Sequence, residues 1–105
     1  MPTRMEQLQA FLKDSRNDAF LQYAVAQEHI SAGNDEDARV CFEKLRSEQP
    51  DYVATYYHLG KLLERKGERE AALAIYAEGI AVATRTQEQH ALSELQSAKL
   101  ELEYD

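Results

Sequence analysis

Apolar side chains recur at helical spacing through almost the whole chain, and only short breaks separate the stretches that carry them. Residues 18–32, for example, place Leu21, Val25 and Ile30 in a stripe along one predicted helix. The composition favours the same structure, because the 105 residues include only two prolines and four glycines. The pattern predicts six helices, over residues 3–14, 18–32, 35–48, 52–66, 68–83 and 87–103.

Glycine and acidic residues mark the predicted helix ends. Gly33 and Gly67 each follow an apolar stretch, and glycine adopts the left-handed conformation at a helix C-terminus without a Cβ clash. Asn34 or Asp35 can accept hydrogen bonds from the first N–H groups of the next helix, and Asp51 can do so at the start of the fourth helix. These signals predict helix pairs joined by tight turns.

The pattern repeats after 34 residues, and such a period is typical of repeat proteins. When residues 19–52 are aligned with residues 53–86, four positions are identical, and they fall where a helix pair has structural requirements. The glycines end helices, and the small alanines let two helices approach closely. The identical pairs are Tyr23 with Tyr57, Gly33 with Gly67, Glu36 with Glu70, and Ala38 with Ala72.

Further positions carry the same pattern, namely Val25, Ala26, Phe42, Leu45 and Pro50 in the first unit and Tyr56, Leu59, Gly60, Tyr76 and Gly79 in the second. Together these residues resemble the tetratricopeptide repeat, with a first repeat over residues 19–52 and a second over residues 53–86. The resemblance implies an all-α fold in which antiparallel helix-pair repeats stack in a right-handed superhelix. For residues 1–105 we therefore expect a single domain of about six helices.

Both flanks of the repeats carry signals for a terminal helix, which a two-repeat array needs in order to cover its outer faces. Thr3 and Glu6 have the spacing of a capping box at the start of the first predicted helix. Thr86 and Gln89 have the same spacing before the last one. Thr84 stands where the family often has proline, so the second repeat is expected to run on or to turn differently. We interpret the last helix as a solvating cap, with a partner-swapping arm as the alternative.

No set of residues has the pattern of a catalytic, metal or cofactor site. His29, His58 and His90 lie in different predicted helices, and no two of them have the same-helix spacing of metal ligands. Cys41 has no second cysteine to pair with, and we interpret it as a packing residue rather than a nucleophile. The four glycines stand apart, so they form no phosphate-binding loop. The sequence therefore predicts a protein that is not an enzyme and needs no cofactor or metal.

The net charge of −7 at pH 7 argues against nucleic acid and anionic membranes as partners. No apolar run approaches the roughly 18 residues that a membrane span needs. Arg4, Glu6 and Lys13 interrupt the first predicted helix, which therefore lacks the apolar core of a signal peptide. A single unpaired cysteine suits a reducing compartment. We therefore expect a cytoplasmic protein.

The resemblance also implies where a partner would bind. In the family, the first helix of each repeat lines a concave groove that holds a peptide. Tyr23 and Tyr57 are equivalent, so two phenol rings would lie along this groove, and tyrosine offers a large contact area with little entropy to lose. The groove positions in this sequence are Phe20, Tyr23, Gln27, Ile30 and Ser31 in the first repeat and Ala54, Tyr57, Lys61, Glu64 and Arg65 in the second.

Lys61 and Arg65 lie one turn apart and form a short basic stripe on an acidic protein. They are candidates for capturing a carboxylate of a partner. The alternative is a solvated face in which they pair with Glu64, Glu68 or Glu70. Our leading hypothesis is an interaction module that binds a peptide or a protein surface in the groove. A hypothesis of a different class is structural self-association, as a homodimer through the terminal helices.

Overall fold

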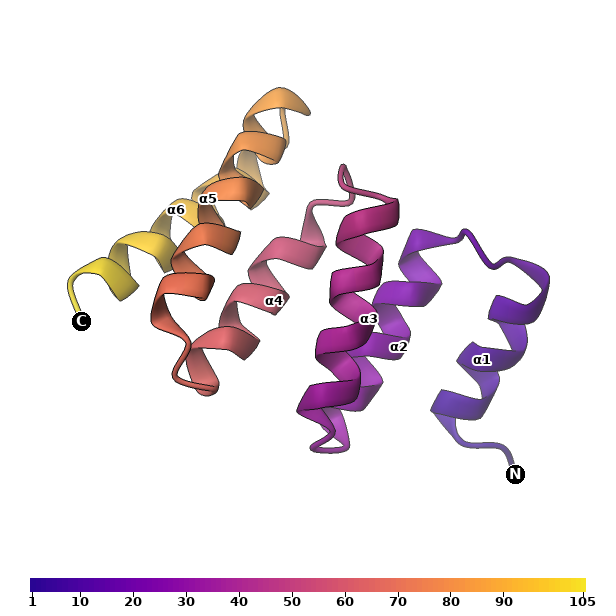
Figure 1. The fold of residues 1–105 in the computed structure, drawn as a ribbon. Coiled ribbons are helices and arrows are strands. Elements are labelled where there is room, and N and C mark those ends of the chain that lie inside the picture. Colours follow the sequence, from indigo (N-terminus) through magenta and orange to yellow (C-terminus); the bar gives the residue numbers. More distant parts are fainter. The chain divides into compact units, whose positions relative to one another are not determined.

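The structure is a computed structural model that describes all residues from 1 to 105. It contains six helices and no strand, which confirms the predicted all-α class, and none of the helices is long and apolar enough to cross a membrane (Figure 1). The chain divides into two compact units, Met1–Gln49 and Pro50–Asp105, and each is described by itself. The single domain expected for the whole chain stays a prediction. The helices are α1 (Arg4–Asp14), α2 (Ala19–Ser31), α3 (Asp35–Glu48), α4 (Ala54–Arg65), α5 (Arg69–Arg85) and α6 (Gln89–Glu103).

In the first unit, α1 packs on α2 and α2 packs on α3. Thr3 and Glu6 form the predicted capping box, because each accepts a hydrogen bond from the backbone N–H of the other, at 3.1 and 3.0 Å. These bonds hold the pKa of Glu6 below its usual range. Asp18 begins α2 by accepting a hydrogen bond from the N–H of Leu21. The buried side chains Leu8, Ala24 and Val25 pack with Met5, Leu12, Leu21 and Cys41.

In the second unit, α5 packs against both α4 and α6, and α4 also contacts α6. Two glycines allow these helices to approach closely. A Cβ atom at Gly60 would overlap the ring of Tyr76, and a Cβ atom at Gly79 would lie 2.5 Å from the Cβ of Tyr56. Both tyrosine side chains are fully buried. At both positions α4 and α5 therefore pack glycine backbone directly against an aromatic side chain, with no space for a Cβ atom.

The helices α2, α4 and α5 end in the same hydrogen-bonded turn, in which one residue has left-handed backbone. Gly33 and Gly67 have φ angles of +79° and +78°, as their position in the sequence predicts. Gln87 takes the corresponding place after α5 with a φ of +60°. There the N–H of Glu88 donates to the carbonyl of Ala83 at 2.9 Å. The second repeat thus runs on to Arg85 and turns without proline.

Two predicted helix N-caps, Thr86 and Asp51, are wrong. Thr86 belongs to the end of α5, where its hydroxyl donates back to a carbonyl of that helix, and Glu88 stands before α6 instead. Asp51 lies too far before α4, and it accepts a hydrogen bond from Arg85 Nη2 at 2.7 Å. This contact holds the pKa of Asp51 below its usual range. Asn34 is the N-cap residue of α3, as predicted, although its side chain forms no hydrogen bond to the helix. Local spacing predicted the caps at Thr86 and Asp51 wrongly because the hydroxyl of Thr86 bonds to the end of α5 and the carboxylate of Asp51 binds Arg85.

Candidate functional site

An open hollow of about 250 Å³ lies between α4 and α6 on the surface of the second unit. It is slightly smaller than the pockets that typically enclose a small-molecule ligand, which run from roughly 300 to 1,000 Å³. Its size suits a small group, such as one or two side chains of a partner. The lining residues are Tyr57 and Lys61 of α4 and His90, Ser93, Glu94, Ser97, Ala98 and Glu101 of α6.

The apolar faces of the two helices determine which side chains reach this hollow. On α4, Leu59 and Leu63 enter the core, and Tyr57 and Lys61, one turn apart, stand on a neighbouring face. On α6, Leu95 and the buried residues one and two turns after it point into the unit. The polar residues beside that stripe therefore form a row along the edge of α6 that faces the α4 side chains.

Lys61 already has two partners within the unit. Its Nζ lies 3.6 Å from Oε2 of Glu64 and 5.6 Å from the centroid of the Tyr57 ring. The first contact is an ion pair between partly exposed groups, and the second is a cation–π contact. The structure thus contains the pairing with Glu64 that the sequence left open as an alternative to carboxylate capture.

Glu64 contacts both Lys61, which lines the hollow, and a tyrosine in the core. It accepts a hydrogen bond from the hydroxyl of Tyr76, whose side chain is fully buried. Burial and the Glu64 carboxylate raise the pKa of Tyr76 above its ordinary range, so the phenol stays protonated and remains a donor. The Glu64 carboxylate therefore pairs with both the buried Tyr76 hydroxyl and the Lys61 ammonium, and these contacts stabilise the second unit.

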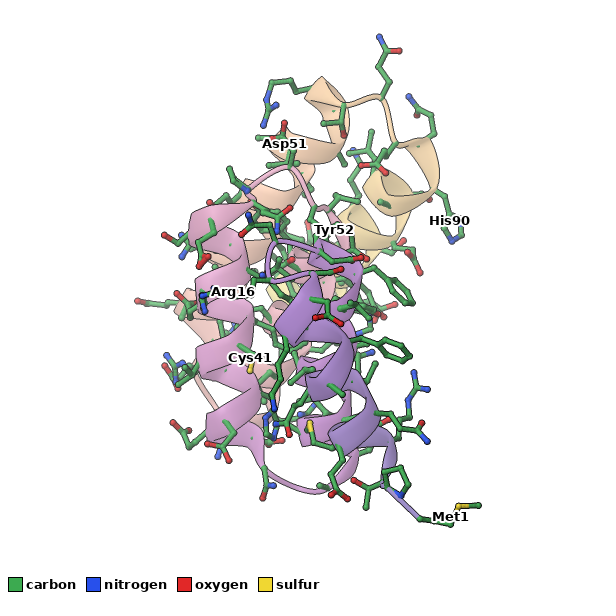
Figure 2. The ribbon with its side chains drawn as sticks, turned by 90° about the vertical axis from the view of Figure 1, so that its right-hand side faces the viewer. Met1, Arg16, Cys41, Asp51, Tyr52 and His90 are labelled. Atoms are coloured by element: carbon green, nitrogen blue, oxygen red, sulfur yellow. The ribbon has the colours of Figure 1, made fainter.

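Two histidines lie at or next to the hollow. His90 projects from α6 into solvent with 91% of its side chain exposed, and its Nε2 lies 3.7 Å from Oε1 of Glu94 (Figure 2). His58 is half-buried, and its ring meets the Tyr57 ring nearly edge-on at 5.4 Å between centroids. Burial lowers the pKa of His58, against the opposing effect of the Glu94 charge, so that its imidazole is neutral at pH 7. His58 therefore supports the Tyr57 ring and adds no charge.

Carboxylates set the charge of the hollow. Glu94 and Glu101 stand two turns apart on α6, and both line it. Lys61 is the one lysine or arginine in the lining, and Glu64 balances its charge. What remains is a negative, partly hydroxylated surface with an aromatic wall from Tyr57. Such a surface can attract a cation and can offer acceptors to an N–H donor.

In the first unit the structure places the predicted groove residues on α2. Phe20 is 60% exposed, an unusual degree for phenylalanine. Tyr23 is half-buried, with its ring 6.4 Å from that of the buried Phe42, and its hydroxyl accepts a hydrogen bond from Gln27 Nε2 at 3.2 Å. Tyr23 and Gln27 therefore form one local pair, and Tyr23 contributes to the packing of its own unit.

The structure brings together only part of the predicted site in the second unit. Tyr57 and Lys61 line the hollow, whereas Arg65 lies exposed in the last turn of α4 and outside that lining. The sequence pattern predicts a solvating cap for α6 and does not reveal that this helix lines the hollow. The signal for this role is a polar row beside an apolar stripe, in which Ser93, Ser97 and Glu101 recur every four residues and Glu94 lies next to Ser93.

The chemistry-bearing residues elsewhere do not assemble into a reactive site. Cys41 is half-buried beside a smaller hollow of about 120 Å³ lined by Leu12, Gln22, Val25 and Lys44, and Figure 2 shows it on α3. Burial raises the pKa of its thiol, which disfavours the reactive thiolate. No group of three or more histidine, cysteine, aspartate or glutamate side chains is arranged to hold a metal ion.

Comparison with known proteins identifies the family. The model of the tetratricopeptide repeat family matches residues 18–52. The crystal structure of a tetratricopeptide repeat domain protein from Salinibacter ruber is 50% identical, with a TM-score of 0.80, over 83% of this chain and 97% of that one. A solution structure of a tetratricopeptide repeat domain protein from the same organism is also 50% identical, with a TM-score of 0.81, over 83% and 88% of the two chains.

A third solved structure shows the same fold at lower identity. It is the solution structure of a protein from Bordetella parapertussis, 23% identical with a TM-score of 0.84, over 99% of this chain and 90% of that one. No protein of curated function matches the sequence significantly. On the evidence of the helix pairs, the glycine turns and the Salinibacter structures, the chain belongs to the tetratricopeptide repeat family.

Proposed function

We propose that this protein is a non-catalytic interaction module that binds a peptide or protein surface through the first helices of its two repeats. Tetratricopeptide repeat domains generally serve as protein–protein interaction modules. The observation that carries the proposal is the hollow between α4 and α6, because Tyr57 stands in it on the helix that the family uses for binding. The single free cysteine is consistent with a cytoplasmic location, which forms part of the proposal.

Each unit offers contacts of its own to a partner. The hollow of the second unit supplies the rim of the Tyr57 ring and the polar row of α6. The face of α2 supplies Phe20, together with the Tyr23 and Gln27 pair. An exposed phenylalanine and rigid tyrosines are typical anchors of a binding surface, since their burial releases water at a small cost in side-chain entropy. Arg65, in the last turn of α4, would add a charged contact at the edge.

The proposal can be tested before any natural partner is identified. A random peptide library displayed on phage is selected on the immobilised full chain, and the selected peptides are measured by fluorescence anisotropy. We expect Tyr57→Ala to weaken their binding roughly 5- to 30-fold, because truncation of a central aromatic anchor typically removes about 1–2 kcal/mol. Tyr104→Ala is the matched control, since Tyr104 is 83% exposed and lies outside the hollow.

The outcome depends on the fold being intact in both variants, which circular dichroism at 222 nm verifies. Equal loss of binding in the Tyr57 and Tyr104 variants would show that the peptides use another surface. If repeated selection enriches no peptide that binds the wild-type chain, the proposed function itself is contradicted.

The alternative is self-association through a terminal helix, and one observation favours it. Leu100 and Tyr104 lie one turn apart at the end of α6 and are 56% and 83% exposed. A pair of apolar groups on an outer face is a natural contact for a symmetric dimer. Sedimentation velocity separates the two functions, since a monomer at several hundred micromolar would exclude the dimer and a dimer dissociated by Leu100→Ser would support it.

A further inference from the structure

We propose that the hollow between α4 and α6 receives basic side chains, so that the partner is a protein segment carrying arginine or lysine at this site. The inference rests on the proposed function and specifies the chemistry of its partner. The partner group has the opposite charge to the carboxylate that Lys61 and Arg65 were candidates for capturing, the alternative for these two residues being internal pairing. Three features of the hollow carry the inference: its charge balance, its aromatic wall and the spacing of its carboxylates.

The charge of the hollow depends on which of its charged side chains already have a partner within the unit. The ammonium of Lys61 lies 3.6 Å from the Glu64 carboxylate, and the same carboxylate accepts a hydrogen bond from the buried hydroxyl of Tyr76. A partner carboxylate could recruit Lys61 only by competing with this pair. It would also approach Glu94 and Glu101, and Glu101 forms no ion pair of its own. A cation of the partner would instead be attracted by the carboxylates of Glu94 and Glu101, and it would displace no existing ion pair of Glu101.

The wall of the hollow suits a guanidinium or an ammonium group. Tyr57 is only half-buried and its ring lines the hollow, and the contact of the ring with Lys61 Nζ, 5.6 Å from the centroid, shows that the ring can attract a cation. The hydroxyl oxygens of Ser93 and Ser97 stand on the facing helix and can accept hydrogen bonds from N–H donors. An arginine is favoured over a lysine, because its planar group can contact the ring and donate to a carboxylate at the same time.

The spacing of the two carboxylates defines the kind of segment. Glu94 and Glu101 are seven residues apart on α6, which corresponds to about 10 Å along the helix axis. A chain in the polyproline II conformation has three residues per turn and rises about 3.1 Å per residue, so side chains three positions apart lie on one side at about 9 Å. Two basic residues separated by two others on an extended segment therefore match both carboxylates.

The test is a titration of the ¹⁵N-labelled full chain with a synthetic peptide, followed by two-dimensional NMR. The probe is the acetylated and amidated hexapeptide Gly-Arg-Pro-Pro-Arg-Gly, and its counterpart carries glutamate in place of both arginines. We expect the dibasic peptide to produce saturable shifts at the amides of α4 and α6 around Tyr57 and Glu94. The diacidic peptide is expected to leave these amides unchanged at the same concentrations.

Variants separate the hollow from the general acidity of the chain. Glu94→Gln and Glu101→Gln are each expected to raise the Kd of the dibasic peptide about threefold, and the double variant about tenfold, since an exposed charge pair contributes modestly. The control is the double variant Glu48→Gln with Glu70→Gln, which removes the same charge from exposed positions outside the hollow. The control is expected to change the Kd by less than twofold.

The possible outcomes distinguish this inference from the proposed function. The inference is overturned if the control double variant weakens the dibasic peptide as much as the hollow variants do, or if the α4 and α6 amides do not shift. Binding of the diacidic peptide that Lys61→Gln abolishes would also overturn it, while the interaction function would stand. Peptides that require Tyr57 but ignore Glu94 and Glu101 would likewise leave the proposed function intact and remove only the basic partner.

Discussion

A single backbone angle shows how one residue limits the stability of the second unit. Gln87 occupies the left-handed position after α5 with a φ of +60°, whereas glycine fills the equivalent positions Gly33 and Gly67. A residue with a Cβ atom in this conformation costs roughly 1–2 kcal/mol, and glycine avoids that cost but loses more chain entropy on folding. Because the strain of the left-handed conformation exceeds the extra loss of chain entropy, glycine at this turn should make the folded state modestly more stable than glutamine does.

We expect Gln87→Gly to raise the free energy of unfolding by about 0.5–1 kcal/mol, because it removes the left-handed strain at a position where the backbone bonds of the turn are kept. Urea denaturation followed by circular dichroism measures the change. The reciprocal variant Gly67→Gln places a side chain at a φ of +78° in open space, so strain alone should lower the stability by a similar amount. Opposite signs for the two variants are required, and two changes of the same sign would refute the argument.

At the scale of helices, an arginine from one element completes the end of another. Arg69 stands in the first turn of α5, and its Nη2 lies 3.1 Å from the carbonyl of Leu102 and 3.3 Å from that of Glu103. The last carbonyls of a helix have no partner within the helix, and a cation there also suits the negative end of the helix dipole. Arg69 thus anchors the end of α6, the helix that forms one side of the hollow.

Replacement of this arginine should loosen the end of α6 before it affects the rest of the unit. We expect Arg69→Gln to lower the free energy of unfolding by about 0.5–1.5 kcal/mol and to speed amide hydrogen exchange in the last turn of α6. Lys99→Gln is the comparison, because it removes only a surface pair with Glu103 at 3.1 Å within the same helix. Equal exchange rates in the two variants would show that the contacts across the helices have no such role.

The elements were more predictable from the sequence than the site. Helical spacing and the two glycine turns predicted six helices, since both signals depend on neighbours within one or two turns. The predicted cap at Thr86 failed for the same reason, because its local spacing took no account of how far α5 continues. The hollow depends on a contact between two helices that the whole of α5 separates in the sequence. The sequence marked the row from Ser93 to Glu101 as polar, and only the packing of α4 against α6 shows what that row faces.

At the scale of the whole molecule, the net charge of −7 affects folding and binding in opposite ways. The chain has nineteen acidic residues and twelve lysines and arginines. The excess carboxylates repel one another more strongly in the folded chain than in the expanded unfolded chain. The same excess of carboxylates would draw a basic segment toward the hollow. Added salt shortens the screening length from about 10 Å at 0.1 M to about 3 Å at 1 M, and it therefore weakens both the repulsion and the attraction.

We therefore expect sodium chloride between 0.05 and 0.5 M to raise the midpoint of thermal unfolding by a few degrees and to raise the Kd of the dibasic peptide severalfold. Calorimetry measures the first change, and the NMR titration repeated at each salt concentration measures the second. The ion pairs of the chain are at least partly exposed, and Arg85 with Asp51 at 2.7 Å is largely so, which makes their loss on screening too small to reverse the first effect. A midpoint that falls with salt would mean that these pairs outweigh the repulsion. A Kd that does not change would mean that the peptide is held by its prolines against Tyr57 rather than by the carboxylates of α6.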